Sequence, residues 1–208
     1  EQGNIHEVKN SAIRTANILE KKIKEGFKVI TPIASCSLML KSHWPLICPE
    51  NENVQLLSKN TLDLDEYLWK LYTEKKLNTD FNKLEKNITL HNSCHSRAQN
   101  IGPKSAKLLD LLPGVKTINV EKCSGHGGTW GVKKKWNKTA RKIGSTTARK
   151  VFKQEGNLIA STCPLAGLHL KDINEDKKIS ENKEKIFHPI ELVAKSYKKD
   201  ISEGDYYE

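Results

Sequence analysis

The sequence predicts an α/β protein of two similar Rossmann-like βα units with mostly parallel sheets. Two observations lead to this prediction. Short apolar, β-rich segments alternate with helical segments along the chain, and a cysteine follows four of the expected strands. Ligands of such sheets gather beyond the carboxyl ends of the strands. The four cysteines expected to line one sheet edge are Cys36, Cys94, Cys123 and Cys163.

The first unit is assigned to residues 1–75 and is expected to be the C-terminal part of a cysteine-rich unit. Its expected elements are a helix over 8–23, a strand over 27–33, a short helix ending before Pro45, a loop with a helical turn over 45–60, and a helix beginning at Asp63. Glu66 lies three residues after Asp63, which is the spacing of a capping box.

The second cysteine-rich unit is assigned to residues 76–208. Its expected elements are a polar segment over 75–86, a buried strand over 87–92, a helix from Pro103 to Pro113, a strand over 115–120, a long basic helix from Trp136 stopped by Glu155-Gly156, a strand over 158–160, a helix beginning at Pro164, a hydrophilic segment over 171–185, and a final helix after His188.

An internal repeat supports the two-unit interpretation. Residues 29–40 resemble residues 158–170, and each segment follows a helix that ends in Glu-Gly. Matching Gly26 to Gly156 places Glu1 opposite Gly131, just past a glycine-rich motif. We therefore expect the natural protein to extend further at the N-terminus, with additional cysteines.

The amino-acid composition limits the classes of function that this protein can have. The 208 residues are 37% apolar, which is typical of a folded globular protein, and no apolar run approaches the length that spans a bilayer. The net charge is +10, and residues 131–153 contain nine basic residues and no acidic one. A solvated helix face is the commonest explanation of such a run, with an acidic partner or lipid headgroups as alternatives. Without an RNA-binding motif or interleaved exposed aromatic residues, we do not expect nucleic acid binding.

The cysteine pattern favours metal or redox chemistry. Five cysteines is an odd number, and no secretory leader precedes them, which argues against a disulfide framework. Thiolates on separate strand-end loops are soft ligands held around one point, as a metal or cluster requires. A single cysteine could equally be a small core residue, but the joint placement of four favours a site. Cys48 follows no strand and is predicted to be a core thiol.

Other side chains near these cysteines are candidates for the same site. His95, His126 and His169 could ligate, donate hydrogen bonds to cluster sulfur or relay protons, although a lone histidine usually does none of these. His188 is most simply a helix cap. A Cys94-His95 nucleophilic pair is formally open, but adjacent loop residues rarely aim at each other.

The glycine-rich loop that follows Cys123 departs from the dinucleotide fingerprint, because the third glycine of that pattern falls at Trp130. Glycines also let the backbone approach a bulky cofactor, and their N–H groups can stabilise an anionic centre. The loop residues Ser124, Gly125 and His126 are therefore predicted to contact the cofactor.

Taken together, the motifs resemble the cysteine-rich (CCG) domain family of the heterodisulfide reductases, and within it the iron–sulfur subunits C of anaerobic glycerol-3-phosphate dehydrogenases. The resemblance covers nearly the whole chain. It rests on Cys36 to Lys41 with Trp44-Pro45, Cys94-His95 with Arg97 to Gly102, Cys123 to Gly128, Cys163 to Gly167, and His188 to Leu192.

The family pattern is Cys, then Cys-Cys-Gly, then Cys-x-x-Cys, usually present twice. Cys94, Cys123 and Cys163 match three of its five positions, whereas Ser124 and Ala166 replace the other two. Cys36 matches a terminal cysteine of the first repeat. The resemblance implies that these four cysteines bind an iron–sulfur cluster of the 4Fe–4S type, with zinc as the alternative.

The resemblance also implies a role in electron transfer. A partner flavoprotein oxidises glycerol 3-phosphate, and this subunit passes the electrons toward quinone, so no substrate site is expected in this chain. The expected location is the cytoplasm, peripheral to the inner face of the cytoplasmic membrane. The alternatives are a zinc-stabilised interaction module and a thiol/disulfide reductase of the heterodisulfide reductase type.

Overall fold

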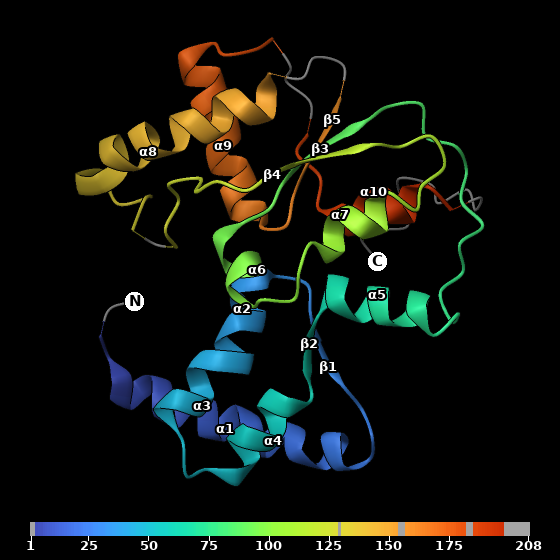
Figure 1. Ribbon diagram of the computed structural model, residues 1–208. Helices are drawn as coiled ribbons and strands as arrows, with labels where there is room; N and C mark the ends of the chain where they lie inside the picture. Colours follow the sequence, from blue (N-terminus) through green and yellow to red (C-terminus); the bar gives the residue numbers. More distant parts are fainter. Residues whose placement is uncertain (1–2, 129, 154–156, 182–184, 198–208) are drawn as a thin grey trace, which may run out of the picture.

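The computed structural model describes residues 3–128, 130–153, 157–181 and 185–197. It confirms the α/β class: the strands form a two-stranded sheet of order β1-β2 and a three-stranded sheet of order β4-β3-β5, and every strand pair is parallel. Figure 1 shows the two sheets in separate lobes that meet near α2 and α6. None of the described helices is both long and apolar enough to cross a membrane.

The N-terminal unit, from α1 to α5, packs its helices around a small apolar core. Ala12 and Ala16 of α1 pack with Val54 and Leu57 of α4. The elements are α1 (Ile5–Lys24), β1 (Val29–Thr31), α2 (Ala34–Leu38), the π-helical segment η1 (Met39–His43), α3 (Trp44–Ile47), α4 (Glu52–Lys59), β2 (Thr61–Asp63) and α5 (Leu64–Thr73).

Two predictions in this unit are wrong. Helical structure continues through Pro45 to Ile47, and the segment predicted as a loop with a short helical turn contains the eight-residue helix α4, with β2 directly after it. Pro45 has no N–H to offer the Lys41 carbonyl, and the Ser58 hydroxyl donates to that carbonyl instead at 2.7 Å. The chain therefore passes the proline by a local π-helical turn rather than by ending the helix.

The C-terminal unit, from β3 to α10, has three layers. Along β5, Ile159 packs toward α8 and α9, whereas Ala160 packs on the opposite side with Leu109 of α7 and Leu192 of α10. The elements are β3 (Ile88–His91), α6 (Cys94–Ala98), α7 (Lys104–Leu109), β4 (Thr117–Val120), α8 (Lys134–Phe152), β5 (Leu158–Ser161), α9 (Pro164–Lys177) and α10 (Pro189–Lys195).

The strands of this unit lie close to their predicted positions, and β3 is buried at every residue. The short helix α6 was not predicted. Helix α9 extends into the hydrophilic segment because Ile173 is buried in the core, and the helix stops where Lys178 adopts a left-handed conformation at φ +48°. The predicted stop at Glu155-Gly156 lies outside the described residues.

The two repeated segments fold alike. In each unit a strand is followed two residues later by a helix N-cap, which is Ile33 after β1 and Cys163 after β5. Ile30 then pairs in parallel with Leu62, as Ala160 does with Phe187. The next residue in each case, Asp63 or His188, begins a helix with a capping box. We propose that the boundary between the two units lies at residues 75–76.

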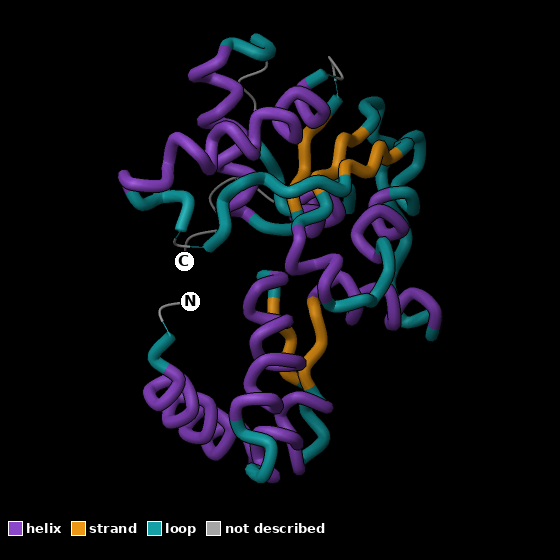
Figure 2. The backbone as a smooth tube through the Cα atoms, turned by 60° about the vertical axis from the view of Figure 1, so that its left-hand side comes forward, coloured by secondary structure: helices purple, strands orange, loops and turns teal. Residues whose placement is uncertain are grey.

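The units contact each other through α2 with α6 and through α5 with α7. Figure 1 shows α2 and α6 next to each other between the two lobes, and Figure 2 shows the same two lobes from another side. The Gln99 amide donates to the Asp63 carboxylate at 2.9 Å, and the Ser105 hydroxyl donates to Asp65. These polar contacts, one partly buried and one buried, join the units beside the ends of their strands.

Candidate cofactor site

Three cysteines follow the three strands of the larger sheet. Cys94 is the first residue of α6, Cys123 lies three residues after β4, and Cys163 is the N-cap of α9. Because the strands are parallel neighbours, all three positions lie at the carboxyl edge of one sheet. Cys94 and Cys123 are exposed, and Cys163 is half-buried. The predicted placement of cysteines at strand ends is confirmed.

Cys36 reaches the same edge from the other unit. It lies on α2, which packs against α6, and its thiol is exposed. Burial raises the pKa of the Cys163 thiol, the N–H groups of Ala166 and Leu165 oppose that effect, and the nearby Cys94 and Cys36 add to the rise. Cys36 and Cys94 are therefore close enough to Cys163 to interact electrostatically. Within the described ranges, however, no three Cys, His, Asp or Glu side chains are arranged to hold a metal ion.

The glycine-rich loop after Cys123 is pressed against α8. Gly125 has φ +80°, and a Cβ at this position would lie 2.2 Å from the Ala140 carbonyl oxygen. The Gly125 N–H points to the Cys123 sulfur at 3.4 Å. Ser124 is buried, and its hydroxyl accepts from the His126 N–H at 3.3 Å. The loop therefore presents the Cys123 thiol outward and turns Ser124 inward.

Two of the predicted histidines pair behind this loop. The rings of His126 and His169 meet edge to face, with their centroids 5.8 Å apart. His169 is 5% exposed, and its Nε2 is buried without a hydrogen-bond partner in the described protein. Burial lowers the pKa of His169, which favours the neutral imidazole. His95 lies on α6 directly after Cys94 and is half-buried.

His91, at the end of β3, holds the cysteine loops in position, a structural role that was not predicted from the sequence. It ends β3, its Nδ1 bonds the Ser161 hydroxyl at 3.0 Å, and its Nε2 bonds the Lys122 carbonyl at 3.0 Å. Ser161 in turn accepts from the Cys163 N–H at 3.3 Å. His91 thus ties together the loops that lead to Cys123 and Cys163. The sequence feature that could have indicated this role is a histidine within a strand that is buried at every residue.

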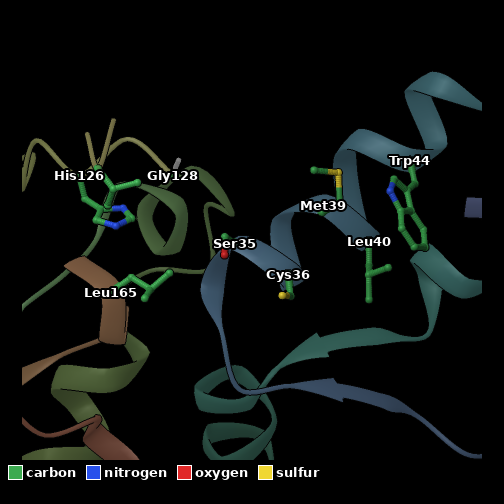
Figure 3. Close-up of a pocket in the computed structure, with 9 residues that line it drawn as sticks. Ser35, Cys36, Met39, Leu40, Trp44, His126, Gly128 and Leu165 are labelled. Carbon is green, nitrogen blue, oxygen red and sulfur yellow. The ribbon is translucent and has the colours of Figure 1, made fainter. Parts of the chain in front are cut away.

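A largely apolar cavity of 760 Å³ lies beside Cys36. Figure 3 shows Cys36, Met39, Leu40 and Trp44 along its N-terminal side, with His126, Gly128 and Leu165 opposite them. The residues that line it are Ser35, Cys36, Met39, Leu40, Trp44, His126, Gly128, Val132 and Leu165. Both units contribute to its walls, so the cavity depends on how they meet.

Two residues were predicted to have structural roles, and both predictions are confirmed. Cys48 is 2% exposed in the core of the N-terminal unit, away from the other cysteines. His188 caps α10, where its Nδ1 accepts from the Ile190 N–H at 3.3 Å. Burial lowers the pKa of His188, although the Asp63 and Glu191 carboxylates oppose this.

The fold and the cysteines define a class of protein: an α/β domain with thiols gathered at the carboxyl edge of a parallel sheet. Residues 88–171 match the cysteine-rich domain family CCG, which confirms the predicted resemblance to this family. This stretch includes Cys94, Cys123 and Cys163.

Two curated relatives extend the similarity. This chain is 28% identical over 185 residues to a subunit of the fumarate reductase (CoM/CoB) of Methanothermobacter marburgensis. The match covers 86% of this chain and 35% of that relative. It is also 28% identical over 121 residues to an uncharacterized iron-sulfur protein of Methanocaldococcus jannaschii. That match covers 55% of this chain and 24% of the relative. The chain therefore spans about a third or less of the length of these relatives.

Proposed function

We propose that this chain is part of an iron–sulfur electron-transfer subunit of an oxidoreductase. The observation that supports the proposal best is the collection of strand-end cysteines where the two units meet. Membership of the cysteine-rich domain family and similarity to a reductase subunit and an iron-sulfur protein point in the same direction.

The donors at this edge suit an iron–sulfur cluster. We propose that Cys94, Cys123 and Cys163 hold it, with Cys36 as a fourth thiolate from the N-terminal unit. Four thiolates are the ligand set of a 4Fe–4S cluster, which we propose as the type. Such a cluster supplies one-electron transfer when it is bound. The glycine loop brings the backbone close to the Cys123 sulfur, and its N–H groups can stabilise the anionic centre.

The His126–His169 pair and His95 complete the surroundings of the proposed site. Their imidazoles can donate hydrogen bonds to sulfur or hold a proton beside it. The apolar cavity walls limit the access of water, which lowers the local dielectric constant and so affects the reduction potential.

For the partner, we propose a flavoprotein dehydrogenase of the glycerol-3-phosphate dehydrogenase type, with quinone as the eventual electron acceptor. This part of the proposal depends on the motif resemblance, and the names of the two relatives do not include it. We place the subunit in the cytoplasm, peripheral to the inner face of the membrane.

The test is iron and sulfide analysis of the anaerobically purified full-length protein, with electron paramagnetic resonance after reduction. We expect stoichiometric iron and a signal from the reduced cluster. Cys123→Ala should abolish cofactor retention, whereas Cys48→Ala should retain the cofactor because Cys48 is in the core of the N-terminal unit. A colourless, redox-silent protein with stoichiometric zinc would overturn the proposal, as would cluster loss in Cys48→Ala alone.

A further inference from the structure

The outer face of α8 is a strongly basic surface. Among the nine basic residues of 131–153, Arg141 is bound to the Asp176 carboxylate at 3.2 Å and to the Asp172 carbonyl. The other eight are exposed, and none forms an ion pair with another residue in the described part of the chain. These residues are Lys133, Lys134, Lys135, Lys138, Lys142, Arg149, Lys150 and Lys153.

Exposed apolar side chains lie beside these charges. Val132, Trp136 and Ile143 are 62%, 38% and 46% exposed. Trp136 and Ile143 are seven residues apart and lie along one side of α8, whereas Val132 precedes the helix by two residues. Lys135, Lys142 and Arg149 form an adjacent basic row at intervals of seven. Trp136 stacks on Trp130 at 5.8 Å, and the Lys135 ammonium lies 4.7 Å from its ring centre. The indole is thus held as a fixed platform.

This face adjoins the candidate cofactor site. Val132 lies two residues before α8 and also lines the apolar cavity, whose walls include Cys36 and His126. A macromolecule seated on the α8 face can therefore place an apolar side chain in that cavity. An apolar centre with a polar rim is the usual anatomy of a protein interface.

We propose that the outer face of α8 and the adjoining cavity form one docking surface for an acidic protein, and that this protein is the electron-transfer partner. The partner role rests on the proposed function, whereas the docking surface follows from the charges and exposed apolar residues described above. Opposite charges steer the encounter, and the apolar contacts beside the cavity retain the complex.

A protein fits this face better than a lipid surface does. A helix that lies in a membrane interface buries its apolar face in lipid. In α8 that face is occupied, because Ala148, Val151 and Phe152 pack in the core with residues of α9. What remains exposed on α8 and the two residues before it is mainly charge, with the three apolar side chains Val132, Trp136 and Ile143, and this composition is suited to an acidic protein surface.

The test measures binding to oxidised flavodoxin, a small acidic flavoprotein carrier, by calorimetry on the full-length protein. Because binding is read directly, no cluster is required. We expect a complex at about 20 mM salt that weakens at about 200 mM. The variant Lys135→Glu/Lys142→Glu/Arg149→Glu should weaken it about 10-fold or more, and Val132→Ser should weaken it less.

The matched control is Lys9→Glu/Arg14→Glu/Lys21→Glu on α1, which changes the net charge equally at three exposed positions of the other long helix. It should bind like the wild type, and thermal melts should show that both triple variants are folded. Equal weakening by the two triple variants would overturn the proposal, as would no flavodoxin binding at low salt.

Three further results distinguish protein docking from lipid or nucleic acid binding, and the docking surface from the proposed function. Tight binding to vesicles of anionic phospholipid or to single-stranded DNA, with none to flavodoxin, would overturn the protein-docking proposal. Iron-free protein that still shows the expected binding pattern would count against the proposed function and leave the docking surface supported. Iron-loaded protein that binds flavodoxin equally well with and without the α8 charges would support the proposed function and overturn the docking surface.

Discussion

The two units share one framework but differ in what they place on it. In the C-terminal unit β5 has β3 on one side and Phe187 on the other, whereas among the described residues β1 pairs with β2 alone. The C-terminal unit also contains three strand-end cysteines, and the N-terminal unit has one.

The strand-to-helix junctions make the difference most visible. At the N-cap, Ile33 of the first unit corresponds to Cys163 of the second, and both have extended backbones. Three residues later Cys36 corresponds to Ala166. Each junction thus has a cysteine at one of two positions three residues apart, and the occupied positions of the two units are complementary. The framework is set by strand pairing and helix caps, which leave these two positions free to vary in chemistry.

The largest expected stability effect concerns a contact of the C-terminal unit. A Cβ at Gly144 in α8 would lie 2.2 Å from the Ser124 carbonyl oxygen and 2.6 Å from Ile173. Gly144→Ala should therefore force α8 away from the cysteine loop and cost about 3 kcal/mol or more. Urea unfolding measures this cost.

Gly26 is the control from the N-terminal unit. It has φ +98°, but a Cβ there would meet no atom within 4 Å. Gly26→Ala should cost about 1–2 kcal/mol from backbone strain alone. Equal costs at the two positions would show that the loop does not depend on close contact with α8.

A second prediction concerns the buried carboxyl group between the units. Burial raises the pKa of Asp65 to about 7, the Ser105 hydroxyl opposes this, and the charge of Asp63 adds to it. Because the folded state favours neutral Asp65, this group makes the protein less stable as the pH rises from about 4 to about 7. The stability lost in this range is fully regained only when the pH falls below the pKa that Asp65 has in the unfolded chain.

Asp65→Asn keeps an acceptor for Ser105 and removes the titration. Between pH 5 and pH 8 the variant should gain roughly 2–3 kcal/mol relative to the wild type. Thermal unfolding across this pH range checks the prediction. Parallel pH profiles for the two proteins would contradict it.

The smallest effect tests the contact between the units directly. The Gln99 side chain donates to Asp63 at 2.9 Å and accepts from Lys41 at 3.3 Å. Gln99→Ala should cost about 1 kcal/mol. Hydrogen exchange should show faster exchange in both α2 and α6, because the lost bonds join the two units.

Gln55→Ala is the matched control, since the Gln55 amide bonds the carbonyls of Pro45 and Cys48 within the N-terminal unit. Its effect on exchange should stay within that unit. If Gln99→Ala also changed exchange on one side only, the contact would be too weak to couple the units.

Sequence patterns identified the parts of the fold that depend on local interactions. The short apolar strands, the Asp63 capping box and the cap at His188 all follow from neighbouring residues, and the cysteines follow directly from the strands. The full length of helix α4 and the whole of strand β2 were not predicted, because their pairing with α1 and β1 depends on tertiary contacts.

The surroundings of the candidate site were harder to predict for the same reason. His91 meets Ser161, a residue seventy positions away, and Gln99 meets Asp63 from a different unit. Neither contact leaves a spacing signal in the sequence. The direction in which Ser124 points likewise depends on how the loop packs against α8.

The complementary cysteine positions at the two strand-to-helix junctions affect how strongly the two units are held together. Within one unit, the sulfur-to-sulfur distance of a Cys-x-x-Cys pair is set by a single helical turn. Here Cys36 and Cys163 belong to different units, so their distance is set by how those units close on each other. The proposed cluster, if held by both cysteines, would link the two units, because its binding free energy would add to the free energy with which the two units associate.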